Sequence, residues 1–478
     1  MLLVLHAIGV AAIWATALRE SPVTAAFFLS AAVWVAFRAL SFRSATPVAI
    51  GITVGATILL MATSASGFVR VPDVGFGVQK LSVLILLVLL AVVAWVDLTD
   101  FHRRKIVDEG ARAAVNKFVR RHGIRILWMG VAGFIAIYAL LLPLVAEWRF
   151  RQLPPPENPL QVMDRLTLQQ SVLFNLCESV TAIFFFVIGA CVGSFLNVVI
   201  YRVPLGISVL VKPSHCPGCD EKISGRDNLP IVGWLKLKGC CRNCGIGISS
   251  RYPTVELVVG LVFLILYFVQ LISGGTNLPG RNPNQYAGVL WILFYTKWDL
   301  VGLYFYHCLL MCTLFSWAMI QRDGQRVPVR VIALMFVLLA SPPLLSPHLL
   351  PYPAVGAGLS GVVRSYEAAE TAVTMGVGLA AGFCLAFLYR LFSRFAGQST
   401  IPDHVASWML FGMALGWQAV LFVFVLMLVW HLLMFVHRCV FDVHPERPKF
   451  ALVNVHLVLP WVVFIHHCVW RSLVYAVT

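Results

Sequence analysis

The chain has 478 residues, of which 60% are hydrophobic and only 12% are charged, and its mean hydropathy is +0.85. This composition excludes an ordinary soluble enzyme, because so much apolar side chain cannot be covered by a water-facing surface. The net charge of +15 would suggest nucleic acid as a partner in a soluble domain. In a membrane protein it indicates basic cytoplasmic loops. We therefore expect an all-α polytopic membrane protein that contacts the lipid bilayer and no nucleic acid.

Apolar runs predict about thirteen membrane-spanning helices. A spanning helix needs about 20 residues, and the candidates before residue 150 are 2–18, 24–37, 47–68, 81–96 and 126–146. Eight more follow at about 176–201, 253–272, 301–320, 329–345, 371–389, 404–414, 418–436 and 451–470. We divide 404–436 because it is too long for one crossing and contains Gly412 and Gly416. Although residues 15–17 resemble a signal-peptide cleavage site, no basic residue precedes the first apolar run, which favours a retained span.

Two basic loops set the predicted orientation. Residues 97–125 carry eight basic and four acidic residues, and residues 202–252 carry eight basic and three acidic residues. Both loops are therefore predicted to be cytoplasmic. The two spans between them make this assignment self-consistent.

Four cysteines in the second loop form two CxxC motifs, Cys216 with Cys219 and Cys241 with Cys244, separated by 21 residues. Four thiolates at this spacing can close a tetrahedral zinc site. Two disulfides are the alternative, but a cytoplasmic loop is kept reduced. We expect a structural zinc site in a small zinc-ribbon-like loop, with the neighbouring Cys240 and His215 as possible competing ligands.

The residues around these motifs are distinctive. The helix entering the loop reads GACVGSFLNVVIYR over residues 189–202, and it places Asn197 inside an apolar span. Small residues four apart allow close helix approach, and an intramembrane polar residue must find a partner or mark a site. After the second motif the chain continues RYPTVEL over residues 251–257.

Residues 189–257 closely resemble the N-terminal domain of the bacterial type IV prepilin leader peptidase (prepilin peptidase/N-methyltransferase) family. The resemblance implies an inner-membrane, multi-pass aspartic endopeptidase that cleaves the leaders of type IV prepilins or pseudopilins at the cytoplasmic face. It also implies N-methylation of the new N-terminus with S-adenosylmethionine as a further activity. We divide the chain into an additional region of five spans (1–175), the prepilin-peptidase N-terminal-type domain (176–272) and an aspartic-peptidase-type membrane domain (273–478).

The family's catalytic aspartates have no direct equivalents here. Peptide hydrolysis by this route needs two carboxylates that share one proton. The family position seven residues before Pro328 holds Gln321, whose carboxamide cannot act as a base, and Asp323 follows two residues later. Asp323 is then either a displaced catalytic residue or a solvated residue of an Asp-Gly turn.

The second aspartate belongs to a glycine-rich motif that is also altered. Counting back from Gly416 leads to His404, and Asp403 immediately precedes it; neither motif glycine is present, and Ala406 replaces the usual lysine. Because it follows a proline and precedes an apolar helix, Asp403 is either catalytic or an N-cap.

Three functions remain open from the sequence. The first is a leader peptidase that uses Asp323 and Asp403, with Glu256 and Asn197 shaping the nearby site. The second is a non-enzymatic scaffold of the same fold that assists pilus assembly or type II secretion. The third is a transporter or channel, which would require more ionisable residues near mid-membrane. The late histidines, among them His466 and His467, are expected to be scattered at the membrane interface.

Overall fold

The computed structural model describes residues 109–151, 166–209, 214–216, 218–275, 277–279, 288–350, 368–395, 404–428 and 455–477. Residues Asn116–Val474 form one compact unit, and Met1–Val115 with Tyr475–Thr478 form a second. Within the described residues the regular structure is helical, apart from two isolated β-bridges. The predicted all-α class is thus confirmed for this part of the chain.

Five helices are long and apolar enough to cross a membrane, as judged by length and composition: Val119–Trp148, Leu168–Arg202, Arg251–Ile272, Trp298–Arg322 and Ala368–Leu391. They coincide with the predicted spans at 126–146, 176–201, 253–272, 301–320 and 371–389. The first four predicted spans lie outside the described residues, so the total of thirteen stays a prediction. The protein is a membrane protein.

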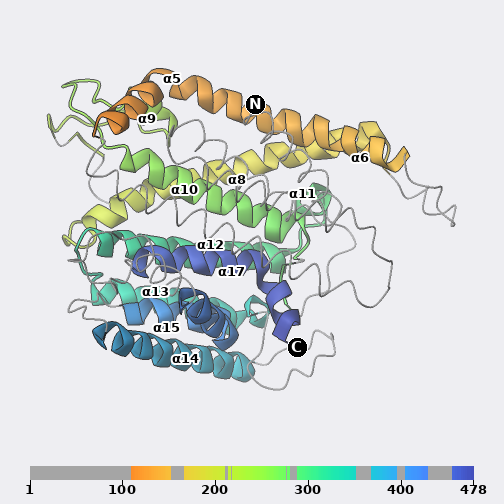
Figure 1. Ribbon diagram of the computed structural model, residues 1–478, viewed down its shortest axis with the longest axis vertical. Helices are drawn as coiled ribbons and strands as arrows, with labels where there is room; N and C mark the ends of the chain where they lie inside the picture. Colours follow the sequence, from red (N-terminus) through yellow and green to blue (C-terminus); the bar gives the residue numbers. More distant parts are fainter. Residues whose placement is uncertain are drawn as a thin grey trace, which may run out of the picture. The chain divides into compact units, whose positions relative to one another are not determined.

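The long helices follow one another through short connections (Figure 1). Near the start, α5 (Glu109–Ile135) continues through a π-helical stretch, η1 (Ala136–Leu141), into α6 (Leu142–Arg151). The later long helices are α8 (Leu168–Arg202), α10 (Arg251–Leu266) with η3 (Tyr267–Ile272), α12 (Trp298–Arg322), α13 (Val329–Leu345), α14 (Ala368–Phe395), α15 (His404–Leu415) and α17 (Val455–Val477). The short ones are η2 (Gly225–Asp227), α9 (Val232–Lys236), α11 (Val289–Phe294) and η4 (Pro347–Leu349).

Helix α8 packs lengthwise against α10 because glycines let the two backbones approach (Figure 1). A Cβ added at Gly193 would lie 2.8 Å from the Cα of Glu256, and one at Gly189 would lie 3.0 Å from the Cα of Gly260. The helix starts at a capping box in which Thr167 and Gln170 bond reciprocally. This confirms close approach at the small residues spaced four apart.

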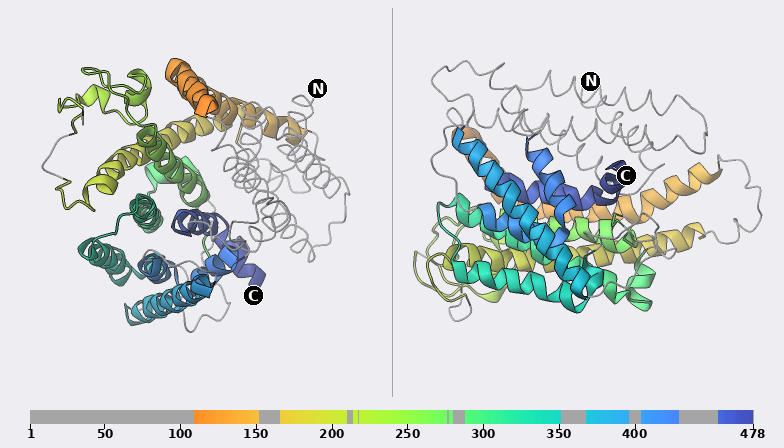
Figure 2. Two further views of the ribbon diagram at one scale, coloured as in Figure 1. Left: turned by 60° about the vertical axis from the view of Figure 1, so that its left-hand side comes forward. Right: turned by 90° about the horizontal axis from the view of Figure 1, so that it is seen from below.

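A second glycine contact joins α14 to α15, which lie side by side in both views of Figure 2. A Cβ at Gly378 would lie 2.0 Å from the carbonyl oxygen of Gly412. Gly412 is therefore a packing residue inside α15, and the predicted interruption there is wrong. Gly416 does break the run, at a φ of +92°, before the next helix begins at Trp417.

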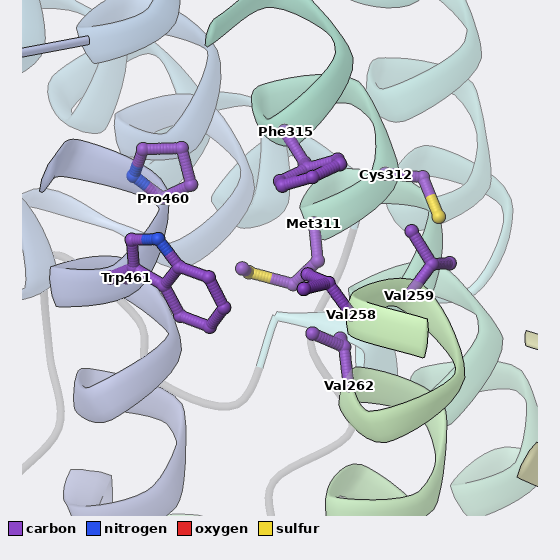
Figure 3. Close-up of a pocket in the computed structure, with 8 residues that line it drawn as sticks. All are labelled: Val258, Val259, Val262, Met311, Cys312, Phe315, Pro460 and Trp461. Atoms are coloured by element: carbon purple, nitrogen blue, oxygen red, sulfur yellow. The ribbon is translucent and has the colours of Figure 1, made fainter. Parts of the chain in front are cut away.

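The core of the described bundle is centred on α12, whose side chains are buried along most of its length. Where α10, α12 and α17 meet, an apolar cavity of about 20 Å³ is bordered by Met311, Trp461 and neighbouring residues (Figure 3). Such a space is apolar throughout and has no polar group to hold a water. We interpret it as a packing defect between helices rather than a site.

Candidate metal centre and membrane-face site

The four cysteines of the CxxC motifs come together. The sulfur atoms of Cys216, Cys219, Cys241 and Cys244 all lie within 4.8 Å of one another. The Sγ atoms of Cys216 and Cys244 are 3.7 Å apart, and those of Cys219 and Cys241 are 4.0 Å apart. Four sulfurs around a tetrahedral ion with bonds of about 2.3 Å stand about 3.8 Å from each other. The cluster fits such an ion, and the separations are far too long for disulfide bonds of about 2.05 Å.

Both CxxC motifs use the same backbone turn, offset by 25 positions along the chain. The amide of Cys216 bonds to the carbonyl of Glu221, and the amide of Cys241 bonds to the carbonyl of Ile246. In each turn the residue that follows the second cysteine has a positive φ, +54° at Asp220 and +72° at Gly245. Backbone amides of Cys244 and Asn243 lower the pKa of the Cys241 thiol to about 7. The local sequence therefore builds two matching knuckles that present thiolate ligands.

An ion pair fastens the second knuckle to the segment between the two motifs. The Asp227 carboxylate accepts two hydrogen bonds of 2.6 Å from the Arg242 guanidinium. The arginine hydrogen bonds, with a further one from Ser224, lower the pKa of Asp227 to about 2. The carboxylate is thus ionised at neutral pH and holds this pairing in place.

The knuckle loop is tied to the membrane helices by Glu256. Its carboxylate accepts a hydrogen bond of 2.6 Å from the amide of Ile231. Ile231 has φ +61° and ψ −54°, and the next amide bonds back to the carbonyl of Pro230 at 2.5 Å. This is a γ-turn, which is rare and strained, and it is centred on a β-branched residue. The buried Glu256 therefore stabilises a costly turn just before α9.

Asn197 also has a structural partner. Its side-chain amide donates to the carbonyl oxygen of Tyr252 at 3.1 Å, which joins the end of α8 to the start of α10. This satisfies the polar group in the apolar span. Its role in shaping a catalytic site stays a prediction, as does that of Glu256.

Helix α5, which precedes the region of resemblance, contacts the knuckle domain. The Arg120 guanidinium lies 6.0 Å from the ring centre of Trp234, within the range of a cation–π contact. A Cβ added at Gly123 would lie 2.5 Å from a side-chain carbon of Leu235. The basic segment 97–125 thus ends in a helix that packs on α9, a contact that the charge count alone did not predict.

Asp323 ends α12 and pairs with a residue from the start of α10. Both of its oxygens accept from the Arg251 guanidinium, at 2.8 and 2.7 Å, and the two side chains are about one third exposed, at 37% and 34%. The neighbouring Gln321 is buried at the end of α12. Sequence reasoning missed Arg251 as a partner, although a basic residue in the conserved-looking RYP run was a visible signal. Asp403 lies outside the described residues.

An open groove of about 600 Å³ lies between the end of α8 and the start of α13. Its lining is mainly apolar and includes Val203, Ile207, Pro328 and Val329, with Arg330 as a charged member. The α13 side of the groove begins five residues after Asp323 in the chain. The groove thus opens at the end of the bundle where the basic loop is predicted to be cytoplasmic.

Comparison with known proteins identifies this part of the chain. The family described as "Bacterial Peptidase A24 N-terminal domain" matches residues 187–270. The chain carries an N-terminal domain of the prepilin leader peptidase/N-methyltransferase family. Over 82 residues it is 54% identical to the prepilin leader peptidase/N-methyltransferase of Myxococcus xanthus, covering 17% of this chain and 24% of that protein.

Two further relatives agree. A type 4 prepilin-like proteins leader peptide-processing enzyme of Escherichia coli is 43% identical over 104 residues, or 18% of this chain and 39% of that protein. The prepilin leader peptidase/N-methyltransferase of Klebsiella pneumoniae is 45% identical over 103 residues, or 20% and 44% of the two chains. The chain therefore spans less than half the length of these curated relatives. No solved structure matches it.

The leader peptidase domain explains the first half of the site and leaves the second half open. Its helix α8, its two knuckles and the start of α10 all fall within residues 187–270. Asp323 and Asp403 lie beyond that range, so their assignment as catalytic residues stays a prediction.

Proposed function

We propose that this protein is a prepilin-type leader peptidase of the bacterial inner membrane that acts on type IV prepilins or pseudopilins at the cytoplasmic face. The observation that carries the proposal is the leader-peptidase N-terminal domain, in which α8, the knuckle loop and α10 are joined by the contacts of Glu256 and Asn197. The groove beside Val329 supports it, because it offers an apolar surface to an extended leader segment.

The chemistry we propose is aspartic, with Asp323 and Asp403 as the two carboxylates. One carboxylate would take a proton from the attacking water while the other, protonated, polarises the scissile carbonyl. Arg251 would act as a positioning residue in this scheme, since it fixes both oxygens of Asp323 at the end of α12. The scheme requires the two carboxyl groups to come within reach of one water molecule.

We further propose that the four-cysteine cluster holds a structural zinc ion. Its sulfur separations of 3.7 and 4.0 Å match a tetrahedral thiolate site. Four thiolate ligands leave no open coordination position, so the ion would stabilise the loop and take no part in the reaction.

A non-enzymatic scaffold for a pilus or type II secretion assembly is the second candidate, and one specific observation favours it. Asp323 has both oxygens engaged by Arg251, and a buried carboxamide, Gln321, occupies the position where the family pattern places its first aspartate. A protein that retained the binding surfaces and lost the acid pair would show this arrangement. It would bind leader segments without cutting them.

Cleavage in a strain that lacks its own leader peptidase separates the two functions. The full chain, with Asp323→Ala and Asp403→Ala variants, would be supplied together with a prepilin and scored for the shift from precursor to mature pilin. Asp299→Ala, at the opposite end of α12, is the matched control and should leave cleavage unchanged. Cleavage that survives both test substitutions removes those residues from the mechanism. Absence of cleavage by the unmodified protein, with membrane insertion verified, favours the scaffold.

The groove can be tested independently of the chemistry. Val329→Ser and Ile207→Ser remove apolar surface from its lining and should weaken crosslinking of a leader peptide to the protein by several-fold. Leu205→Ser, an exposed leucine on the same segment outside the lining, is the control. Equal crosslinking in all three variants would show that the leader does not lie in this groove.

N-methylation forms a separate part of the proposal. It rests on the relatives' names, which include N-methyltransferase activity. Transfer of a labelled methyl group from S-adenosylmethionine to the N-terminus of mature pilin, in membranes containing this protein as the sole candidate, would support it. Cleaved but unlabelled pilin would exclude it.

A further inference from the structure

Three histidines are buried together in the membrane-spanning bundle. His307 of α12 and His467 of α17 are 0% exposed, and His466 is 2% exposed. His307 lies nine residues after Trp298, about 14 Å along a helix, so it is well inside the span. The prediction of interfacial histidines is therefore wrong for His466 and His467. Burial of ionisable side chains within a span is costly and commonly marks a functional site.

The buried polar atoms without partners concentrate at these histidines. Among the described residues, eight buried side-chain nitrogen or oxygen atoms have no hydrogen-bond partner. Five of the eight belong to this histidine cluster: His307 Nε2, His466 Nδ1, His467 Nε2, Gln270 Oε1 and Asn277 Oδ1. Gln270 contacts His307, and Asn277 donates to the backbone carbonyl of His467 at 2.8 Å. Because an unpaired buried polar atom costs about 1–3 kcal/mol, such a concentration points to a ligand.

Two of the rings are prepared to bind through Nε2. The Nδ1 atom of His467 lies 2.8 Å from the carbonyl oxygen of Val463. A carbonyl can only accept, so Nδ1 carries the proton and Nε2 has a free lone pair. The Nδ1 atom of His307 lies 2.7 Å from the side-chain amide of Gln270, and with the amide oxygen turned to the ring the same protonation results. Metal-binding histidines characteristically donate their second ring nitrogen in this way.

The ring separations select which histidines can share an ion. Two imidazoles that bind one ion at about 2.0–2.1 Å, with ligand angles of about 90–109°, place their ring centres about 4.5–5.2 Å apart. The ring centres of His307 and His467 are 4.5 Å apart, whereas those of His466 and His467 are 6.1 Å apart. His307 and His467 therefore fit a shared ion, and His466 is too far from its neighbour.

We propose a second metal site, within the membrane and separate from the cysteine knuckles. It binds a first-row transition-metal ion through Nε2 of His307 and Nε2 of His467. The amide oxygens of Gln270 and Asn277 are the nearby side-chain groups that can complete the coordination or position the rings. Neutral imidazole suits copper, zinc, iron and nickel, and copper binds such ligands most tightly in this series.

Trp470 provides a built-in reporter for this site. Its ring centre lies 6.0 Å from those of both His307 and His467, and the side chain is buried. A bound Cu²⁺ ion would quench its fluorescence. Because the chain contains 14 tryptophans, the signal is the difference between the parent protein and Trp470→Phe. This difference is local, so copper captured by the cysteine knuckles does not contribute to it.

The experiment is a Cu²⁺ titration of the full-length protein in detergent, with Trp470-dependent quenching as the readout. His307→Ala and His467→Ala should each abolish the saturable quenching. Gln270→Leu should weaken binding by about 10–100-fold, as is usual when the partner of a metal-binding histidine is lost. His466→Ala, equally buried but outside the proposed ligand pair, and His348→Ala, which is exposed, are controls that should bind as the parent does.

Two results would overturn the proposal. One is the absence of saturable, Trp470-dependent quenching in the parent protein. The other is binding by the His307→Ala and His467→Ala double variant that equals the parent's. Gel filtration and zinc content report whether each variant is folded, so loss of copper binding in a misfolded variant would be recognised and replaced by the milder His307→Gln test.

Discussion

The pairing of Arg251 with Asp323 gives a sharp test of what Asp323 does. The perturbation is a double-mutant cycle with Arg251→Gln, Asp323→Asn and the combined variant. Each substitution removes the charge and retains much of the side chain's size. The pair joins the start of α10 to the end of α12 through two hydrogen bonds of 2.8 and 2.7 Å.

The geometry sets the expected size of the structural effect. Because both side chains are about one third exposed, at 37% and 34%, solvent screens most of their attraction, and exposed pairs contribute about 0.2–1 kcal/mol. The bidentate arrangement places this pair near the upper end, at about 1 kcal/mol. A solely structural pair would therefore change any equilibrium that depends on it by about five-fold.

A catalytic role predicts a much larger change. Loss of a general base or acid reduces a reaction by about 10²–10⁴-fold, and Asp323→Asn would do so whether or not Arg251 is present. The assay combines thermal unfolding in detergent with the rate of prepilin cleavage for all four proteins. We expect each single variant and the double variant to lose about the same 1 kcal/mol of unfolding free energy.

Two outcomes would refute this reasoning. If the two single effects on stability simply add in the double variant, the ion pair does not exist in the membrane. If cleavage falls by only about five-fold in Asp323→Asn, in parallel with Arg251→Gln, then Asp323 is a positioning residue and not one of the two carboxylates.

Three further predictions concern the knuckle domain and its helix contact. Gly193→Ala forces a Cβ to within 2.8 Å of a backbone carbon of α10 and should cost about 1–3 kcal/mol of unfolding free energy, whereas Gly376→Ala, which has nothing within 4 Å, should cost nothing; equal melting temperatures would contradict the close helix contact. Cys216→Ser with Cys244→Ser should abolish zinc in the purified protein, measured by elemental analysis, and unchanged zinc would exclude the four-cysteine site. Because its arginine partner lowers the pKa of Asp227 to about 2, the stabilisation from this pair is present above about pH 3.9 and is lost as pH falls towards 2. We therefore expect zinc release, monitored with a chromogenic chelator, to precede loss of the pair on acidification, and Asp227→Asn to speed chelator extraction of zinc at neutral pH.

Much of the leader-peptidase domain could be predicted from the sequence because its determinants are local. The CxxC spacing fixes the ligand set, since each knuckle is a short turn whose backbone bonds close within six residues, as at Cys216 and Glu221. The glycines of α8 likewise predict close helix contact, because a missing Cβ is a property of the residue itself. The apolar runs at five spans coincide with helices for the same reason.

The remaining features were decided by tertiary structure, because they depend on how distant helices are rotated against each other. Asp323 meets Arg251, 72 positions away, and Asn277 reaches the backbone of His467, 190 positions away. An apolar span shows which residues lie within the membrane but carries little information about which neighbour each one faces. The two histidines of α17 therefore looked like interfacial residues in the sequence, and only packing against α12 placed one of them beside His307 in the interior.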